Sequence, residues 1–245
     1  MADLSFDLSG RGAVVTGAVG DIGRAVAARL AAAGARVAAL DLAAPEGVGD
    51  IALACDVSDP AAVEAAVAEA AAKFGGLEIL VNNAAAPTPL GDVTQIAPEA
   101  WAHTLGVNLT GAYLMARACL PHFRAQGRGV ILNVASQLGH VTTPGRAAYS
   151  ASKAGLISLT RSLALDHAAE NIRAVSLSPG AVMTGRIVAQ SGSEAAAEAA
   201  FAPLHPIGRV GRVEEIAAAA LFLVSDAAGF VTGTDLLADG GYTAR

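Results

Sequence analysis

Short apolar runs alternate with longer stretches of helical periodicity along most of the chain. Continuous apolar runs rich in Val, Ile, Leu and Ala are typical of strands that are buried on both faces. The predicted strands cover residues 12–16, 36–41, 51–55, 77–81, 129–134, 172–177 and 235–238. The predicted helices cover residues 21–33, 59–74, 98–125 with a break near Gly106, 147–167 and 213–223.

This alternation indicates parallel β-α-β units and a doubly wound sheet of the α/β class. We expect a mostly parallel sheet of seven strands, with helices on both faces. No change of composition and no internal repeat divides the chain, so we predict a single domain over residues 1–245. Residues 178–212 are rich in Gly, Pro and Ser and predict a mobile segment with short helices.

The composition is that of a globular protein and argues against several kinds of partner. Hydrophobic residues make up 53% and charged residues 16% of the chain, and its net charge is −6 without a basic cluster. Nucleic acid and anionic membrane surfaces are therefore not expected as partners. No apolar run approaches the roughly 18–20 residues of a membrane span, and the acidic start of the chain is unlike a signal peptide. We expect a cytoplasmic protein.

Cysteine and histidine give no indication of a disulfide or a metal site. Cys55 and Cys119 both stand in apolar surroundings and do not suggest a disulfide framework. The five histidines lack the spacing of metal ligands, so no metal is expected.

Tyr149 and Lys153 are the first candidates for chemistry. Their i, i+4 spacing places both side chains on one face of the predicted helix 147–167. An ammonium beside a phenol favours the phenolate and is expected to lower the phenol's pKa, which suits general acid–base chemistry on an alcohol or a carbonyl. Lys153 is one of two lysines in the chain and stands among small and apolar residues. Taken alone, such a pair is more often an ordinary contact on a helix surface.

A glycine-rich turn, residues 16–23, joins the first predicted strand to the first predicted helix. The turn residues that we expect to contact a dinucleotide are Gly17, Gly20, Asp21 and Ile22. Glycines there allow a tight turn and a close approach of the main chain to a pyrophosphate, which the helix N-terminus favours. At the end of the second strand, Asp41 can bind the ribose hydroxyls and would repel a 2′-phosphate, so the sequence predicts NAD(H) over NADP(H). The alternative interpretation of Asp41 is a turn-forming residue at a strand end.

With these features in order, the chain resembles the short-chain dehydrogenase/reductase family over nearly its whole length. The turn 16–23 resembles the family's T-G-x-x-x-G-x-G loop. Four other segments resemble further family motifs: Cys55-Asp56-Val57, Asn82-Asn83-Ala84-Ala85, Asn133-Val134-Ala135-Ser136 and Pro179 to Thr184. Ser136 precedes Tyr149 by 13 residues, a spacing that is common in the family. The resemblance implies a Rossmann-type domain and an NAD-dependent oxidoreductase that interconverts a secondary alcohol and a ketone.

The resemblance also implies a role for each matching residue. The implied catalytic set is Asn108, Ser136, Tyr149 and Lys153. In this set Tyr149 is the general acid/base, Lys153 binds the nicotinamide ribose, Ser136 contacts the substrate oxygen and Asn108 fixes a water in a proton relay. The further cofactor contacts that it implies are Asp56, Val57, Asn83, Ala84, Tyr149, Lys153, Pro179, Val182 and Thr184.

Two positions depart from the family pattern. Asp21 stands where the family has the middle glycine of the turn, and Ala85 replaces the last glycine of N-N-A-G. We interpret Asp21 as a cap of the first helix. The alternative is that its charge opposes the pyrophosphate and weakens cofactor binding.

Substrate contacts are expected from the loops beyond the strands' carboxyl ends. Gln137, His140 and Met183 are the candidates, and residues 183–212 form a predicted lid. We expect a small polar substrate such as a polyol or a sugar. A 3-oxoacyl-thioester reductase of the same family is the alternative, and a catalytically silent dinucleotide-binding sensor is a hypothesis from another class.

The helix over residues 147–165 carries small or apolar residues almost all round. One face must cover the sheet, so the other is expected to meet another subunit. The resemblance suggests a homotetramer formed through this helix and the C-terminal strand region.

Overall fold

The computed structural model describes residues 5–245 and contains one seven-stranded sheet in which all neighbouring strands are parallel. The strands are β1 (Gly12–Thr16), β2 (Arg36–Asp41), β3 (Ile51–Ala54), β4 (Ile79–Asn82), β5 (Gly129–Val134), β6 (Ile172–Pro179) and β7 (Asp235–Ala238). The helices are α1 (Asp21–Ala32), α2 (Pro60–Phe74), α3 (Pro98–Leu105), α4 (Gly111–Gln126), α5 (Ala147–His167), α6 (Gly185–Ser191), α7 (Glu194–Phe201) and α8 (Val213–Val224). The predicted doubly wound α/β architecture is confirmed. Part of the N-terminal segment that is unlike a signal peptide lies outside the described residues.

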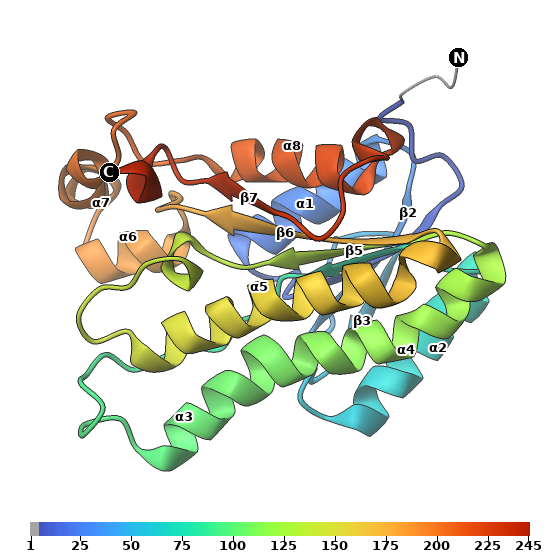
Figure 1. Cartoon of the computed structure of the whole chain (residues 1–245), viewed down its shortest axis with the longest axis horizontal. Coiled ribbons are helices and arrows are strands. Elements are labelled where there is room, and N and C mark those ends of the chain that lie inside the picture. The colour runs from blue at the N-terminus through green and yellow to red at the C-terminus, as the bar shows by residue number, and fades with distance from the viewer. Residues whose placement is uncertain (1–4) are drawn as a thin grey trace.

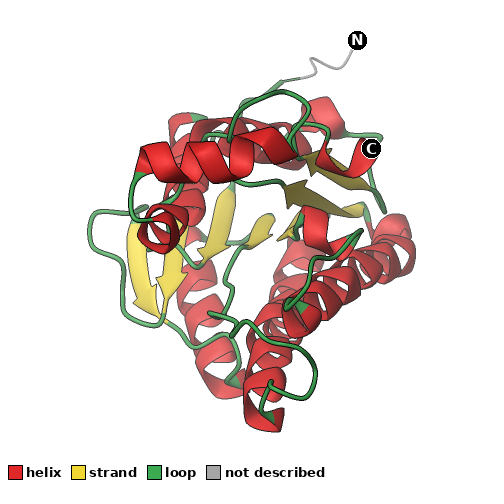
Figure 2. Ribbon diagram, turned by 90° about the vertical axis from the view of Figure 1, so that its left-hand side faces the viewer, coloured by secondary structure: helices red, strands yellow, loops and turns green. Residues whose placement is uncertain are grey.

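The sheet is buried on both faces, which explains the continuous apolar runs of its strands. Ala13 and Val15 of β1 belong to a core shared with α1 and α8, whereas Val14 belongs to the opposite core, shared with α2 and α4. Successive side chains of a strand point to opposite faces, so every position of such a strand must be apolar. Figure 1 shows α1 and α8 on one side of the sheet and α2, α4 and α5 on the other, and Figure 2 shows the strands between these helical layers.

The strand order β3-β2-β1-β4-β5-β6-β7 reverses direction between β1 and β4. The connections that leave these two strands run to opposite faces and leave a crevice beyond their carboxyl ends, where doubly wound sheets bind ligands. Thr16 ends β1 and Asn82 ends β4. The topology therefore brings the glycine-rich turn and the Asn82–Ala85 motif together at this crevice.

The helix predicted over residues 98–125 has no break at Gly106. Gly106 keeps helical dihedral angles (φ −54°, ψ −51°), and α3 continues into α4 through a π-helical turn, Gly106–Thr110. Such wide turns occur frequently at functional sites, and this one contains Asn108. Smaller differences occur at strand ends, since β4 begins at Ile79 and β6 extends to Pro179.

Within residues 5–245, no helix has the length and hydropathy that a membrane crossing requires. The same part of the chain holds no group of three or more His, Cys, Asp or Glu side chains suited to a metal ion. Both cysteines are free and buried, and burial raises the pKa of Cys55 to about 11 and that of Cys119 to about 12. Both side chains therefore remain thiols at neutral pH.

Candidate active site

The turn after β1 has the backbone shape that a pyrophosphate site needs. Gly17 has a φ of +65°, and a Cβ atom added there would lie 2.8 Å from the Ala84 Cα. A Cβ on Gly23 would overlap the Gly17 carbonyl, whereas one on Gly20 would meet only an ordinary contact. Gly20 precedes α1 and offers no side chain to cap it, so the amides of the first turn stay available to an anion. The turn fits a dinucleotide.

Asn83 and Thr16 lock this turn to the end of β4. The Asn83 side-chain amide donates to the carbonyl oxygens of Thr16 (3.1 Å) and Gly17 (3.0 Å). In return, the Thr16 hydroxyl accepts from the backbone N–H groups of Asn83 (3.0 Å) and Ala84 (3.1 Å). The two motifs therefore hold one another, which gives Asn83 and Ala84 a structural task in addition to the predicted cofactor contact.

The carboxylate of Asp41 lies beside the turn, at the end of β2. The backbone N–H groups of Val19 and Leu42 donate to it, at 2.9 and 2.8 Å. Asp41 therefore orders the turn and also presents negative charge where an adenosine ribose would lie. Both interpretations of this residue, as a turn former and as a ribose acceptor, fit the geometry.

Asp56 and Val57 follow β3 at the same edge of the sheet. The Ser58 hydroxyl and backbone N–H both donate to Asp56, at 2.6 and 2.8 Å, and these bonds hold the pKa of that carboxyl below its usual range. Val57 is buried and packs so closely on Gly111 that a Cβ on the glycine would lie 2.8 Å from the Val57 side chain. An exposed, ionised Asp56 beside a buried Val57 suits a pocket for an adenine ring and its amino group.

Asp21 does not cap the first helix, so that interpretation is wrong. The residue before the helix is Gly20, and Asp21 is the first helical residue, with its side chain turned outward. Its carboxylate accepts instead from the backbone N–H of Gly185, at 2.8 Å, where α6 begins. The residue that replaces the family's middle glycine thus joins the cofactor turn to the predicted lid.

We expect two substitutions at Asp21 to separate its charge from this contact. Asp21→Asn keeps an acceptor for Gly185 and removes a charge near the pyrophosphate, so the Kd for NADH should fall about 5-fold in a fluorescence titration. Asp21→Ala also removes the acceptor, and limited proteolysis within residues 185–205 should become faster than in Asp21→Asn. Equal cleavage of the two variants would contradict the joining role.

The segment Pro179–Thr184 leads from β6 into α6 and is held from several directions. The Met183 N–H donates to the Gly211 carbonyl (2.8 Å), and the Gly211 N–H donates to the Ala181 carbonyl (2.9 Å). Val182, between them, is buried. The Thr184 hydroxyl accepts from the Ile187 N–H (3.4 Å) and caps α6. Pro179, the last residue of β6, is buried as well. This rigid loop is suited to present backbone groups to a nicotinamide carboxamide.

His205 is a contributor that the sequence did not indicate. Its Nε2 accepts from the Ala181 N–H (3.1 Å), and its Nδ1 donates to the Phe201 carbonyl (2.8 Å). The imidazole is buried, and it joins the end of α7 to the loop after Pro179. A single histidine in a segment of unknown structure carries no pattern that could have revealed this contact.

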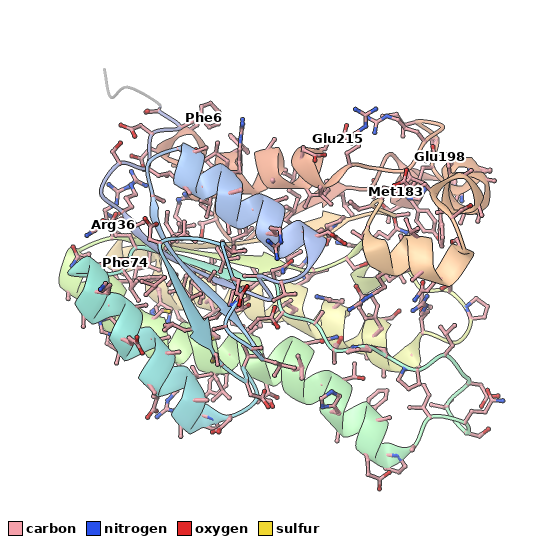
Figure 3. The ribbon with its side chains drawn as sticks, turned by 180° about the vertical axis from the view of Figure 1, so that it is seen from behind. Phe6, Arg36, Phe74, Met183, Glu198 and Glu215 are labelled. Atoms are coloured by element: carbon pink, nitrogen blue, oxygen red, sulfur yellow. The ribbon has the colours of Figure 1, made fainter. Side chains whose placement is uncertain are left out.

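The outer part of the lid is anchored by two carboxylates. Glu198 of α7 accepts from the Val210 N–H (3.1 Å), and Glu215 at the start of α8 binds the Arg209 guanidinium (2.6 Å). Figure 3 shows Met183, Glu198 and Glu215 in this corner of the molecule, around α6 and α7. Met183 is half-buried where β6 leads into α6, as a substrate contact would require.

Asn108 is almost fully buried in the π-helical turn, and its side chain is engaged at both ends. Its Oδ1 accepts from the Ala86 N–H (2.8 Å), and its Nδ2 donates to the Ser152 hydroxyl (3.0 Å). Ser152 in turn donates to the Tyr149 carbonyl, at 2.7 Å. The asparagine thus links the loop after β4 to α5. Ser152 is a residue of this site to which the sequence assigned no role. The water relay remains a prediction.

Lys153 is buried in α5, with 2% of its surface exposed. Its ammonium donates to the Val134 carbonyl at 2.7 Å and lies 5.8 Å from the centre of the Tyr149 ring. Burial, together with the nearby positive charge of Arg186, lowers the pKa of Lys153 to about 8. A lysine that is part-neutral near physiological pH is a proton carrier as well as a hydrogen-bond donor.

Burial raises the pKa of Tyr149, which is opposite to the direction that the spacing with Lys153 suggests. The Ser136 hydroxyl opposes this effect, and so do the positive charges of Arg186 and Arg146. Lys153 is not among the groups that lower this pKa, and its ammonium donates to the Val134 carbonyl. Ser136 itself is 8% exposed and accepts from the Leu138 N–H (3.2 Å). Ser136, Tyr149 and Lys153 thus form one cluster.

The two polar substrate candidates after Ser136 differ in their surroundings. Gln137 is 8% exposed and its Oε1 has no hydrogen-bond partner in the described structure, so it can accept from a ligand. His140 is paired instead with Asp235 of β7, at 2.7 Å, and Asp235 also accepts from the Ser178 hydroxyl at 3.0 Å. This contact draws His140 toward the edge of the sheet and favours Gln137 as the substrate contact.

The chain is similar to several known proteins over nearly its whole length. A family model described as "Enoyl-(Acyl carrier protein) reductase" matches residues 17–243. The chain is 42% identical to a cis-4-hydroxycyclohexanecarboxylate dehydrogenase from Sinomonas cyclohexanicum, over 96% of this chain and 97% of that protein. It is 39% identical to a D-threitol dehydrogenase from Mycolicibacterium smegmatis, over 99% and 96%. It is 37% identical to an NAD-dependent glycerol dehydrogenase from Listeria innocua, over 99% and 98%.

Solved structures of similar sequence share the fold of this chain. A short-chain type dehydrogenase/reductase from Mycobacterium marinum superposes with a TM-score of 0.90 at 33% identity, covering 98% of each chain. A 3-ketoacyl-(acyl-carrier-protein) reductase from Brucella melitensis, complexed with NADH, superposes with a TM-score of 0.88 at 36% identity, covering 98% of this chain and 100% of that one.

Proposed function

Because the chain belongs to the short-chain dehydrogenase/reductase family, we propose that it is an NAD(H)-dependent oxidoreductase that interconverts a secondary alcohol and a ketone. The observation that carries the proposal is the cluster of Ser136, Tyr149 and Lys153 beside a turn shaped for a pyrophosphate. Proton transfer and dinucleotide binding then occur at the same edge of the sheet, which hydride transfer from an alcohol requires.

In this mechanism the nicotinamide supplies the hydride acceptor or donor when it is bound. In oxidation, Tyr149 as phenolate takes the proton from the substrate hydroxyl. Ser136 binds the same oxygen and stabilises the charge that develops on it. Lys153 contacts the nicotinamide ribose and carries the proton onward, and Asn108 keeps the loop after β4 in register with α5. Reduction uses the same groups in the opposite order.

We expect the enzyme to prefer NAD(H) because of Asp41. Its carboxylate is fixed by Val19 and Leu42, and a 2′-phosphate there would meet a negative charge without a basic partner. The ratio of kcat/KM for NAD over NADP should be about 100 or more, and Asp41→Ser should lower this ratio at least 10-fold. A wild-type enzyme that prefers NADP would contradict the assignment.

A small polar substrate, such as a polyol or a sugar, fits the polar groups beside Ser136. The names of two relatives, D-threitol dehydrogenase and glycerol dehydrogenase, support this class. A 3-oxoacyl-thioester reductase is the second candidate, and the Brucella neighbour complexed with NADH favours it. A panel of polyols, sugars, simple secondary alcohols and acyl thioesters, each with NAD and NADP, decides between them. NADH binding without turnover of any member would point to a dinucleotide-binding sensor.

We also propose a homotetramer, because two large apolar side chains are exposed in the regions expected to meet other subunits. Leu165 on α5 is 82% exposed beside a face of small residues, and Phe230, ahead of β7, is fully exposed. Both lie in the regions that the sequence assigns to subunit contacts. Size-exclusion chromatography with light scattering should give four times the mass of one chain, and Leu165→Glu should reduce it. A monomeric wild-type protein would refute the assembly.

A further inference from the structure

Two arginines bring positive charge to the catalytic tyrosine from two different elements. Arg146 directly precedes α5, three positions before Tyr149, and Arg186 is the second residue of α6. Arg146 lies one turn ahead of Tyr149 at the start of this helix, and its positive charge opposes the rise in the pKa of the tyrosine. Arg186 follows Thr184 closely, at the end of the loop that is suited to the nicotinamide.

The backbone on both sides of this site is fixed. The Arg146 carbonyl accepts from the Ser150 N–H at 2.9 Å, and Arg146 forms a bridge with Gly91 in the loop that precedes α3. The start of α6 is held by the bond from the Gly185 N–H to Asp21 and by the Thr184 cap. The arginine side chains are thus attached to ordered positions, with Arg146 half-buried and Arg186 exposed.

Neither guanidinium group is paired with a carboxylate within residues 5–245, although the chain as a whole carries a net charge of −6. The acid that the structure shows next to Arg186 is Asp21, which accepts from the Gly185 N–H. The charged groups that act on Tyr149 are these two arginines, and the one that acts on Lys153 is Arg186. The site is therefore locally cationic within an acidic protein, a distribution that attracts anions.

We propose that Arg186, assisted by Arg146, binds a carboxylate of the substrate, so that the preferred substrate is a small hydroxy acid or its keto acid. The inference rests on the proposed interconversion of a secondary alcohol and a ketone, and it assigns a hydroxy acid as the substrate in place of a polyol or a sugar. A guanidinium matches a carboxylate with two parallel hydrogen bonds, which orients the hydroxyl-bearing carbon as well as adding affinity. The hydroxyl proton passes to Tyr149, the carbinol hydrogen leaves with its electron pair for the nicotinamide, and the C–O bond becomes a carbonyl.

The test compares acids with neutral molecules of the same shape. Wild-type enzyme is assayed with 3-hydroxybutyrate, 4-hydroxypentanoate and 5-hydroxyhexanoate, and with the primary amide of each. We expect kcat/KM for at least one acid to exceed that of its amide by about 30-fold, and Arg186→Gln to remove this preference. Arg186→Lys should keep part of the acid preference, because lysine carries the positive charge but cannot form the two parallel hydrogen bonds of a guanidinium. Arg146→Gln should have a smaller effect in the same direction.

Arg29→Gln is the matched control, since it removes the same charge from an exposed position at the end of α1. The acid preference should be unchanged in this variant. Equal turnover of acids and amides by the wild type would overturn the inference and leave the proposed function intact, whereas turnover of no alcohol at all would overturn the proposed function. If Arg186→Gln weakens NADH binding 10-fold and leaves the acid preference in place, the arginine serves the cofactor and the inference is wrong.

Discussion

Tyr149→Phe is expected to fold, to bind NADH with unchanged affinity and to lose turnover by about 1,000-fold or more. The substitution removes only the phenol oxygen, and the ring keeps its half-buried position on α5. Ser136 binds the same oxygen in the proposed mechanism, but an aliphatic hydroxyl is far less acidic than a phenol, so Ser136 cannot replace the tyrosine as general acid/base. Steady-state kinetics, an NADH titration and the thermal unfolding midpoint measure the three outcomes.

Tyr113→Phe is the control for this change, because Tyr113 lies exposed on α4 and takes no part in the mechanism. It should retain wild-type activity. Substantial turnover in Tyr149→Phe, with Tyr113→Phe unaffected, would remove the tyrosine from its assigned role.

Lys153→Met is expected to be more stable than the wild type at neutral pH and to be inactive. Burial lowers the pKa of Lys153 from 10.5 to about 8, so the folded protein holds a buried ammonium at pH 7 at a cost of about 3 kcal/mol. Loss of the bond to the Val134 carbonyl offsets about 1 kcal/mol of the gain. Urea unfolding near neutral pH should therefore give a free energy of unfolding about 2 kcal/mol higher for the variant than for the wild type.

The advantage of Lys153→Met should shrink as the pH rises. Above pH 8 the folded wild type releases the proton while the unfolded chain keeps it up to about 10.5, so the free energy of unfolding of the wild type increases through this interval. Lys73→Met, at the exposed end of α2, is the control and should change neither stability nor activity. A variant that is less stable than the wild type, or an advantage that is independent of pH, would contradict a charged buried lysine.

The catalytic set illustrates what could be recognised before the fold was known. The pairing of Tyr149 with Lys153 follows from their spacing, and Ser136 follows from the family resemblance. The glycine turn follows from a strand, a turn and a helix that are contiguous in the chain. Alternating strands and helices also determine a parallel, doubly wound sheet, because short crossovers leave few other arrangements. These features depend on interactions between near neighbours or on periodicity, and both are legible in the sequence.

The direction in which the pKa of Tyr149 shifts could not be predicted from residue spacing. Spacing places Lys153 one turn away from Tyr149, but the lysine's ammonium donates to the Val134 carbonyl of β5. The packing around Tyr149 excludes water from the phenol and raises its pKa. Desolvation depends on everything that surrounds a group, so residue spacing along one helix cannot supply its sign.

The chain by itself determined the fold class, and it predicted the dinucleotide turn, the acid at Asp41 and, through the family resemblance, the residues that we propose for catalysis. Only the tertiary structure decided what the variable positions do. It directs Asp21 to Gly185, 164 residues away, and pairs His140 with Asp235. It also brings the positive charge of Arg186 on α6 to act on the pKa of Tyr149 on α5. Contacts between segments so distant in sequence form only when the sheet and its helices have packed. The sequence around one partner gives no indication of the other.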